Sequence, residues 1–139
     1  MTTEGGCLCG QLRYSFEGEP DFVGKCYCMD CHKESGSGHI TFLSVPGNAI
    51  TTTGESREYS KLGDSGRDTV RTFCPSCGTT IFGHPTVLGD VRVVRAGTLD
   101  NPAGLVPAAA VYGSRAPDWD QPPAGLHVFA ELPPLDPDV

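Results

Sequence analysis

All seven cysteines of this chain lie in three short clusters, and thiolates grouped in this way are ligands that zinc prefers. The clusters are Cys7-Leu8-Cys9, Cys26-Tyr27-Cys28-Met29-Asp30-Cys31 and Cys74-Pro75-Ser76-Cys77. Random placement would leave some cysteines isolated, whereas none lies outside a cluster. Cysteines two or three residues apart present their sulfurs to one ion, so the pattern predicts metal binding.

The strongest single zinc signal is the segment Cys74-Pro75-Ser76-Cys77-Gly78. Its proline sets a turn, and its glycine lets backbone amides approach the sulfurs. Cys7-Leu8-Cys9-Gly10 is a shorter segment with the same trailing glycine. A disulfide or a redox pair is the alternative for such turns, but residues 1–6 show no secretory signal, which favours metal over disulfides.

Seven sulfurs divide naturally into a set of four and a set of three. Structural zinc usually takes four protein ligands, whereas catalytic zinc takes three and leaves one position for water or substrate. We therefore predict a closed structural zinc site and an open, catalytic second zinc site. The closed set is Cys7, Cys9, Cys74 and Cys77, and the open set is Cys26, Cys28 and Cys31.

Two alternatives stay open at this point. A competing partition joins Cys28 and Cys31 to Cys74 and Cys77, and it leaves Cys7, Cys9 and Cys26 for other work. A fourth protein ligand could also complete the triplet, with His32, His39, His84 and Asp30 as candidates. Three thiolates hold a metal less securely than four, so we expect two zinc ions per chain with the second site partly occupied.

The elements that carry these clusters are predicted to be strands. Eighteen glycines and twelve prolines in 139 residues imply many turns. Leu12, Tyr14 and Phe16 alternate with polar residues, as in a half-buried strand. Further strands are predicted over 39–45, 49–53, 70–73, 79–82, 91–96 and 108–112, and a single helical turn over 29–34. The predicted fold is mainly β and sandwich-like, with short helical turns only.

Length and charge limit the remaining possibilities. The chain is short for two domains, so we predict a single domain over 1–139, in which about 114–139 form a proline-rich C-terminal wrap. A net charge of −7 opposes binding to nucleic acid or to an anionic membrane surface. No apolar run approaches the roughly 20 residues that span a bilayer. We therefore expect a cytoplasmic protein.

The three clusters, in this order, resemble the glutathione-dependent formaldehyde-activating enzyme family, which includes centromere protein V. The resemblance rests on residues 6–14, on 26–31 followed by Ser35-Gly36, and on 73–79. It implies a zinc-bearing β-sandwich similar to Rab-interacting chaperones and methionine-sulfoxide reductase B. It also implies that the first and third clusters hold a structural zinc and that the middle cluster holds the active zinc.

The activity that this resemblance implies is a carbon–sulfur lyase reaction in which glutathione and formaldehyde form S-(hydroxymethyl)glutathione. A zinc ion with three thiolates and one exchangeable position favours the thiolate of an incoming thiol. Because glutathione is anionic, a cationic patch is needed, for which the candidates are Lys25, His32, Lys33, Arg67 and Arg71. The alternatives are a related thiol adduct, a non-catalytic zinc scaffold, or a thiol redox protein that uses Cys28 and Cys31.

Overall fold

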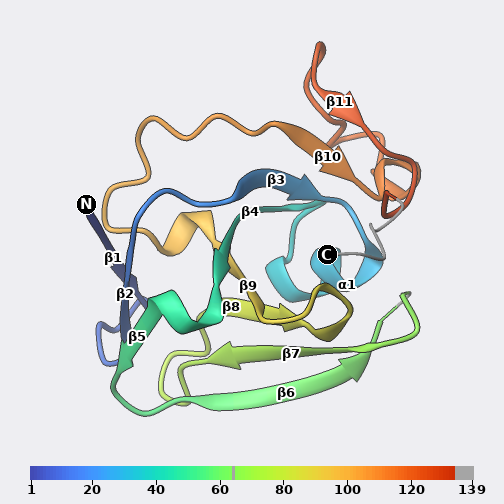
Figure 1. Ribbon diagram of the computed structural model, residues 1–139. Helices are drawn as coiled ribbons and strands as arrows, with labels where there is room; N and C mark the ends of the chain where they lie inside the picture. The colour runs from blue at the N-terminus through green and yellow to red at the C-terminus, as the bar shows by residue number, and fades with distance from the viewer. Residues whose placement is uncertain (64, 134–139) are drawn as a thin grey trace.

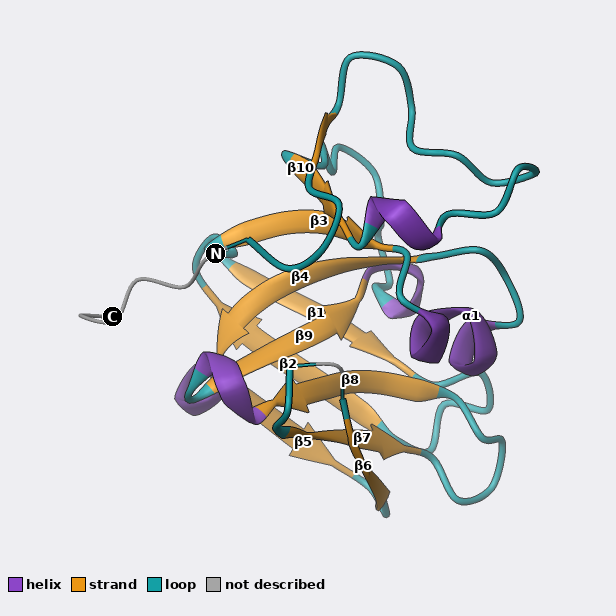
Figure 2. Cartoon of the chain, turned by 90° about the vertical axis from the view of Figure 1, so that its right-hand side faces the viewer, coloured by secondary structure: helices purple, strands orange, loops and turns teal. Residues whose placement is uncertain are grey.

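The computed structural model describes residues 1–63 and 65–133, and strands are its main regular secondary structure (Figures 1 and 2). The strands are β1 Thr2–Gly6, β2 Arg13–Glu17, β3 Phe22–Cys26, β4 Ile40–Pro46, β5 Ile50–Thr53, β6 Arg57–Leu62, β7 Asp68–Phe73, β8 Thr80–Pro85, β9 Val91–Arg95, β10 Ala109–Val111 and β11 His127–Val128. The α-helix is α1 Met29–Ser35, and the 3-10 turns are η1 Gly47–Ala49, η2 Thr86–Leu88, η3 Ala96–Thr98 and η4 Gly113–Arg115. This confirms the mainly β fold class with short helical elements, whereas the particular sandwich type stays a prediction.

The strands form two sheets. The smaller sheet has the order β1-β2-β5, and the larger has the order β11-β10-β3-β4-β9-β8-β7-β6. Strand β10 runs parallel to both β3 and β11, and the other neighbours are antiparallel. Figure 1 shows the small sheet at one end of the larger sheet, with α1 toward the other end.

The main hydrophobic core contains side chains from both sheets. It includes Leu12, Tyr14, Phe16, Leu43, Val45, Ile81 and Val94. The predicted alternation along β2 is confirmed, because Tyr14 and Phe16 are buried while the residues between and beside them are more exposed. Cys7 and Cys74 belong to the same core cluster, so the first and third cysteine clusters are part of the packing that joins the sheets.

Strands β1, β3, β6 and β11 were outside the predicted set. Strand β6 is exposed along its whole length, so it carries no alternating hydrophobic pattern and depends on its pairing with β7 at the sheet edge. Strand β1 is rich in glycine. The ring of Tyr14 and the carbonyl of Thr98 occupy the space that a Cβ at Gly5 would need. Because Gly5 has no side chain, β1 packs closely against these two residues.

The described part of the predicted C-terminal wrap, residues 114–133, is mostly loop and turn, with β11 as a short strand beside β10. It is attached to the body by a hydrogen bond from the Phe129 N–H to the Ala110 carbonyl at 2.9 Å and by a hydrogen bond between His39 Nδ1 and the Asp120 carboxylate at 2.6 Å. Residues 134–139 of the predicted wrap lie outside the described residues. Within the described ranges, the chain has no helix with the length and hydrophobicity needed to cross a membrane.

Candidate metal centres

The first cysteine cluster lies in a tight loop between β1 and β2. The N–H of Cys7 donates to the carbonyl of Leu12 at 2.9 Å, and the N–H of Gly10 donates to the carbonyl of Cys7 at 3.1 Å. Gly10 has φ 83°, a conformation that glycine adopts without strain. The N–H of Leu12 lies 3.2 Å from the Cys7 sulfur, so this backbone turn supports a thiolate at Cys7.

The third cluster forms the matching loop between β7 and β8. The N–H of Cys74 donates to the carbonyl of Thr79 at 2.9 Å, and the N–H of Gly78 donates to the carbonyl of Cys74 at 2.8 Å. Gly78 has φ 79°, which explains the glycine after Cys77. The N–H of Leu8 donates to the hydroxyl of Thr79 at 3.1 Å, so the two cysteine loops are held against each other directly.

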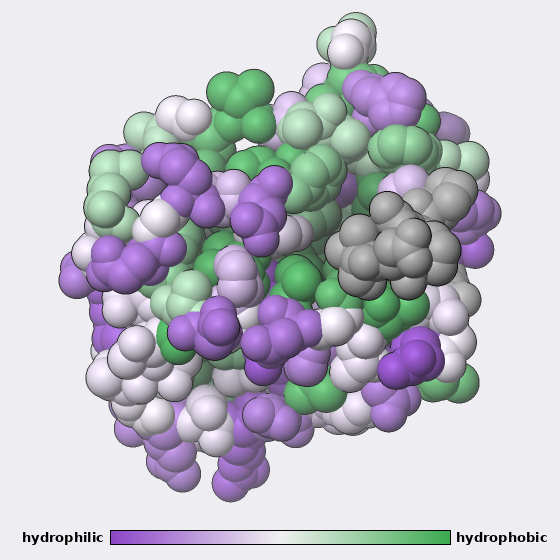
Figure 3. All heavy atoms as spheres, viewed as in Figure 1, coloured by the Kyte–Doolittle hydropathy of each residue, from purple (hydrophilic) through white to green (hydrophobic). Residues whose placement is uncertain are grey.

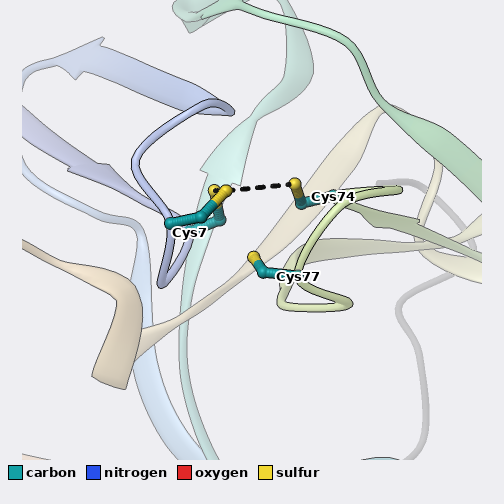
Figure 4. Close-up of side chains that lie close together, drawn as sticks. Cys7, Cys74 and Cys77 are labelled. Atoms are coloured by element: carbon teal, nitrogen blue, oxygen red, sulfur yellow. Dashed lines mark hydrogen bonds between the residues drawn. The ribbon is translucent and has the colours of Figure 1, made fainter.

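These two loops bring four sulfurs together in a group that we call the closed cluster: Cys7, Cys9, Cys74 and Cys77. The four sulfurs all lie within 4.8 Å of one another. The Cys7–Cys9 sulfur distance is 3.6 Å and the Cys9–Cys74 distance is 3.7 Å. Zinc–sulfur bonds of about 2.3 Å in a tetrahedron place the sulfurs about 3.8 Å apart, so this geometry suits zinc. Figure 4 shows Cys7 facing Cys74 and Cys77 across the space between the loops.

The electrostatics of the closed cluster favour thiolates at some positions. A hydrogen bond with the Thr79 hydroxyl, together with backbone N–H groups, lowers the pKa of Cys77 to about 5. The N–H of Gln11 favours the Cys9 thiolate, but the neighbouring sulfurs and burial outweigh it and raise the pKa of Cys9 to about 11. Adjacent sulfurs therefore compete for negative charge, and a divalent cation between them would stabilise several thiolates at once.

The middle cluster, which we call the triplet, consists of Cys26, Cys28 and Cys31. Cys26 ends β3, Cys28 is the N-cap of α1, and Cys31 lies buried in the first turn of α1. Their three sulfurs lie within 4.8 Å of one another. The Cys28–Cys31 distance of 3.0 Å is longer than a disulfide bond of about 2.05 Å. All seven cysteines are free thiols, so both clusters are available to bind metal.

Cys28 has the strongest tendency to ionise in the triplet. Its side-chain hydrogen bonds with Cys26 and Cys31, together with the N–H groups of Cys31 and Asp30, lower the pKa of Cys28 to about 2. The same contacts act in reverse on its partners: the hydrogen bond with Cys28 helps to raise the pKa of Cys26 to about 12. The pKa of Cys31 is raised by its contacts with Cys26 and Cys28 and by burial.

The positions of the sulfurs show how the seven cysteines divide into two groups. The structure places Cys28 and Cys31 with Cys26, and it places Cys74 and Cys77 with the first cluster, so the competing partition is not the one observed. Among the described residues, no histidine or carboxylate joins the triplet as a fourth candidate ligand. His39 instead pairs with Asp120 at 2.6 Å, and the Nε2 atom of His84 lies 2.8 Å from the Gly89 carbonyl.

A buried ion-pair network fixes the helix that carries Cys31. Glu34 of α1 lies 2.7 Å from the Nε atom of Arg71 on β7 and 2.7 Å from an Nη atom of Arg95 on β9. The side chains of Glu34, Arg71 and Arg95 are only 11%, 13% and 13% exposed. Sequence analysis did not identify this anchor, because Glu34 and Arg95 are 61 residues apart and neither carries a recognisable motif.

A cavity lies beside the triplet. It is lined by Cys26, Cys28 and Cys31 together with hydrophobic side chains of the larger sheet, and its volume is about 160 Å³. Of the five residues that the sequence suggested for a cationic patch, Arg71 is the one that lines this cavity among the described residues. The cavity gives a small molecule access to the face of the triplet that no fourth described ligand candidate occupies.

The fold and the two clusters thus define a mainly β protein with two groups of cysteines suited to metal ions. Residues 2–115 match the family described as glutathione-dependent formaldehyde-activating enzyme, and the chain belongs to this family. The match includes all seven cysteines. No curated protein matches the chain significantly. The resemblance inferred from the cysteine pattern is therefore confirmed at the level of the family.

Proposed function

We propose that this protein is a zinc-dependent carbon–sulfur lyase that joins glutathione to formaldehyde as S-(hydroxymethyl)glutathione, or forms a related thiol adduct. The observation that carries the proposal is the triplet: three sulfurs within 4.8 Å, without a fourth candidate ligand among the described residues, beside a cavity. Family membership supports the same chemistry, since the family is described by its dependence on glutathione and its action on formaldehyde.

The proposal assigns two zinc ions to the chain. Cys7, Cys9, Cys74 and Cys77 would hold a structural zinc, and Cys26, Cys28 and Cys31 would hold the second zinc as the catalytic ligands. Four thiolates close the coordination sphere of the first ion, whereas three leave one position exchangeable in the second. When bound at the triplet, zinc supplies a position at which a thiol binds as its thiolate.

The residues around the triplet orient it and keep its surroundings dry. The N–H of Cys31 lies 3.3 Å from the Cys28 sulfur, and the hydroxyl of Ser35 donates to the Cys31 carbonyl at 2.7 Å, so helix α1 is held at both ends. Glu34 ties the same helix to the sheet. In the reaction the thiol sulfur bonds to the carbonyl carbon, the carbon–oxygen π bond breaks, and the thiol proton finishes on oxygen. The hydrophobic cavity wall limits competing hydration.

The test is the rate of exchange between glutathione, formaldehyde and their adduct, measured by NMR with zinc-loaded protein. We expect acceleration over buffer that Cys28→Ser abolishes while the protein stays folded. The matched control is Ser76→Ala, because Ser76 lies in the closed-cluster loop and its hydroxyl donates only to Gln11 at 2.6 Å. Wild-type protein with two zinc ions and no acceleration would eliminate the lyase function in favour of a zinc scaffold.

One observation favours a second candidate function. The Cys28 and Cys31 sulfurs are 3.0 Å apart, and hydrogen bonding with the neighbouring cysteines lowers the pKa of Cys28 to about 2, which also suits a thiol redox pair. Metal content separates the two functions. A lyase carries two zinc ions, whereas a redox protein carries one and shows titratable thiols at the triplet.

A net charge of −7 supports the further proposal that the protein acts on a small thiol without nucleic-acid or membrane partners. A cytoplasmic location stays a prediction.

A further inference from the structure

The cavity beside the triplet has a hydrophobic wall, and a molecule as small as formaldehyde does not require such a wall in order to bind. Its hydrophobic residues come from several separate elements of the fold and include Ile40, Phe42, Val87, Leu88, Val93 and Val111. Ile40, Phe42 and Val111 are buried, so this wall is part of the packed protein and not a surface irregularity. Figure 3 shows hydrophobic residues gathered toward the middle of one face, with hydrophilic residues around them.

The size of the cavity indicates what it can hold. At about 160 Å³ it is close to the roughly 150 Å³ of a hydrophobic protein cavity that accepts benzene. Formaldehyde has no hydrocarbon group to fill such a space. Glutathione is a tripeptide with two carboxylates, and burying those carboxylates against hydrocarbon would cost far more than the contact returns. The volume therefore suits a compact hydrophobic group attached to the reacting centre.

The charged residues that line the cavity are Asp30, Arg71 and Arg95, and all three form ion pairs within the protein, with Arg71 3.9 Å from Asp30. Glu34 accepts hydrogen bonds from Arg71 at 2.7 Å and from Arg95 at 2.7 Å and 3.0 Å. Other guanidinium N–H groups donate to the carbonyls of Thr69 and Val93 at 3.3 Å and 3.2 Å. Two carboxylates, Glu34 and Asp30, therefore face the two arginines, which weakens the attraction of the cavity for an anionic ligand.

A strained residue lies at the same cavity. Tyr112 has φ 55°, and among the described residues it is the only one other than glycine with a positive φ. It lines the cavity directly after Val111, and the Gly113 N–H beside it donates to the Phe129 carbonyl at 2.9 Å, which holds this turn. Non-glycine residues keep such conformations where the surrounding structure requires them, often at binding sites.

We propose that the carbonyl substrate of the triplet is an aldehyde that carries a compact hydrophobic substituent of about the size of a benzene ring, bound in this cavity. The inference rests on the proposed function and narrows its substrate. Glutathione stays outside the hydrophobic cavity and supplies the sulfur, and the cavity selects the aldehyde. The sulfur adds to the aldehyde carbon, the π bond breaks, and the proton moves to oxygen, so the product is a hemithioacetal and no oxidant is needed.

The test compares phenylacetaldehyde with formaldehyde, each with glutathione and zinc-loaded full-length protein, by NMR exchange. The cavity is filled by Val87→Phe, because Val87 lies in the short turn η2 and is only partly buried. We expect this variant to lose at least about 10-fold more acceleration with phenylacetaldehyde than with formaldehyde, as misfits in hydrophobic pockets do. The matched control is Val106→Phe, since Val106 is 79% exposed and lies outside the cavity lining.

A second measurement does not depend on turnover. Titration with 2-phenylethanol, which has the ring but no carbonyl, should shift methyl signals of Leu88 and Val111 in wild-type protein and not in Val87→Phe. Circular dichroism shows that the variant is folded. Absence of 2-phenylethanol binding to the wild-type protein would overturn the assignment of the cavity.

The remaining outcomes separate this inference from the proposed function. Acceleration with formaldehyde alone leaves the lyase function standing and overturns the aldehyde assignment. If the protein accelerates only the reaction of formaldehyde with phenylmethanethiol, the hydrophobic group in the cavity belongs to the thiol and not to the aldehyde. That result would likewise overturn the aldehyde assignment. No acceleration with any pair removes the lyase function itself.

Discussion

The two cysteine clusters have similar ligands but are built in opposite ways. The closed cluster joins two loops 65 residues apart, one after β1 in the small sheet and one after β7 in the large sheet. The triplet is local, because its three cysteines lie within six residues at the junction of β3 and α1. A long-range cluster constrains the fold, whereas a short chelate constrains only its own turn.

Their surroundings differ in the same sense. Cys7 and Cys74 are part of the main core, and the closed cluster lacks space for another ligand in a tetrahedral arrangement. The triplet opens on a cavity and depends on Glu34 for its position. The comparison predicts that identical side chains serve stability at one site and, under the proposed function, chemistry at the other, and the following substitutions test these roles.

The largest effect is expected from Cys74→Ser. A structural zinc site contributes about 10 kcal/mol or more to folding, which is comparable to the whole stability of a domain at about 5–15 kcal/mol. We therefore expect loss of zinc from the closed cluster and loss of the cooperative thermal transition, measured by circular dichroism and elemental analysis. A variant that melts cooperatively near the wild-type temperature would show that the closed cluster is not a structural metal site.

The second-largest effect is expected from a substitution in the triplet, and it concerns activity and metal content. Cys28→Ser should remove one of two zinc ions and abolish thiol exchange, while the thermal transition stays cooperative, because the triplet does not join distant parts of the chain. Elemental analysis beside circular dichroism measures both properties in one sample. Retention of two zinc ions would mean that Cys28 is not a ligand.

Mild chelation compares how tightly the two clusters hold zinc. Three thiolates bind zinc less tightly than four, so a weak chelator should remove one zinc equivalent first and leave the fold intact. The released zinc is followed with a colorimetric indicator and the fold by circular dichroism. Simultaneous release of both ions together with unfolding would contradict the assignment of separate roles.

A smaller effect is expected from Glu34→Gln. The substitution keeps the shape of the side chain but leaves Arg71 and Arg95 without their shared carboxylate, which typically costs about 3 kcal/mol when the ion pair is buried. Urea unfolding measures this loss. Weaker zinc retention at the triplet, with the closed cluster unchanged, is expected because Glu34 positions α1.

The smallest effect is expected from Asp100→Asn, the matched control for Glu34→Gln. Asp100 pairs with Arg13, which lowers the pKa of the Asp100 carboxyl, but the two side chains are 47% and 39% exposed. Ion pairs at this exposure often contribute nothing measurable. Urea unfolding and metal content should match the wild type, and a loss equal to that of Glu34→Gln would remove the distinction between the two networks.

Much of the fold was predictable wherever one strand face is buried. The alternation of Tyr14 and Phe16 identified β2, and the hydrophobic runs identified β4, β5, β7, β8, β9 and β10 to within a few residues. Strand β6 was not predictable, since it is exposed throughout and exists only because β7 pairs with it. The helical turn predicted at 29–34 is the start of α1.

The sequence by itself determined which sulfurs within each cluster act together, because one or two intervening residues leave a loop little freedom to separate them. Only the tertiary structure decided that Cys7 and Cys9 meet Cys74 and Cys77, that Glu34 reaches two strands, and that a hydrophobic cavity lies beside the triplet. These features depend on strand pairing between residues far apart in the chain, and no local pattern of residues specifies that pairing.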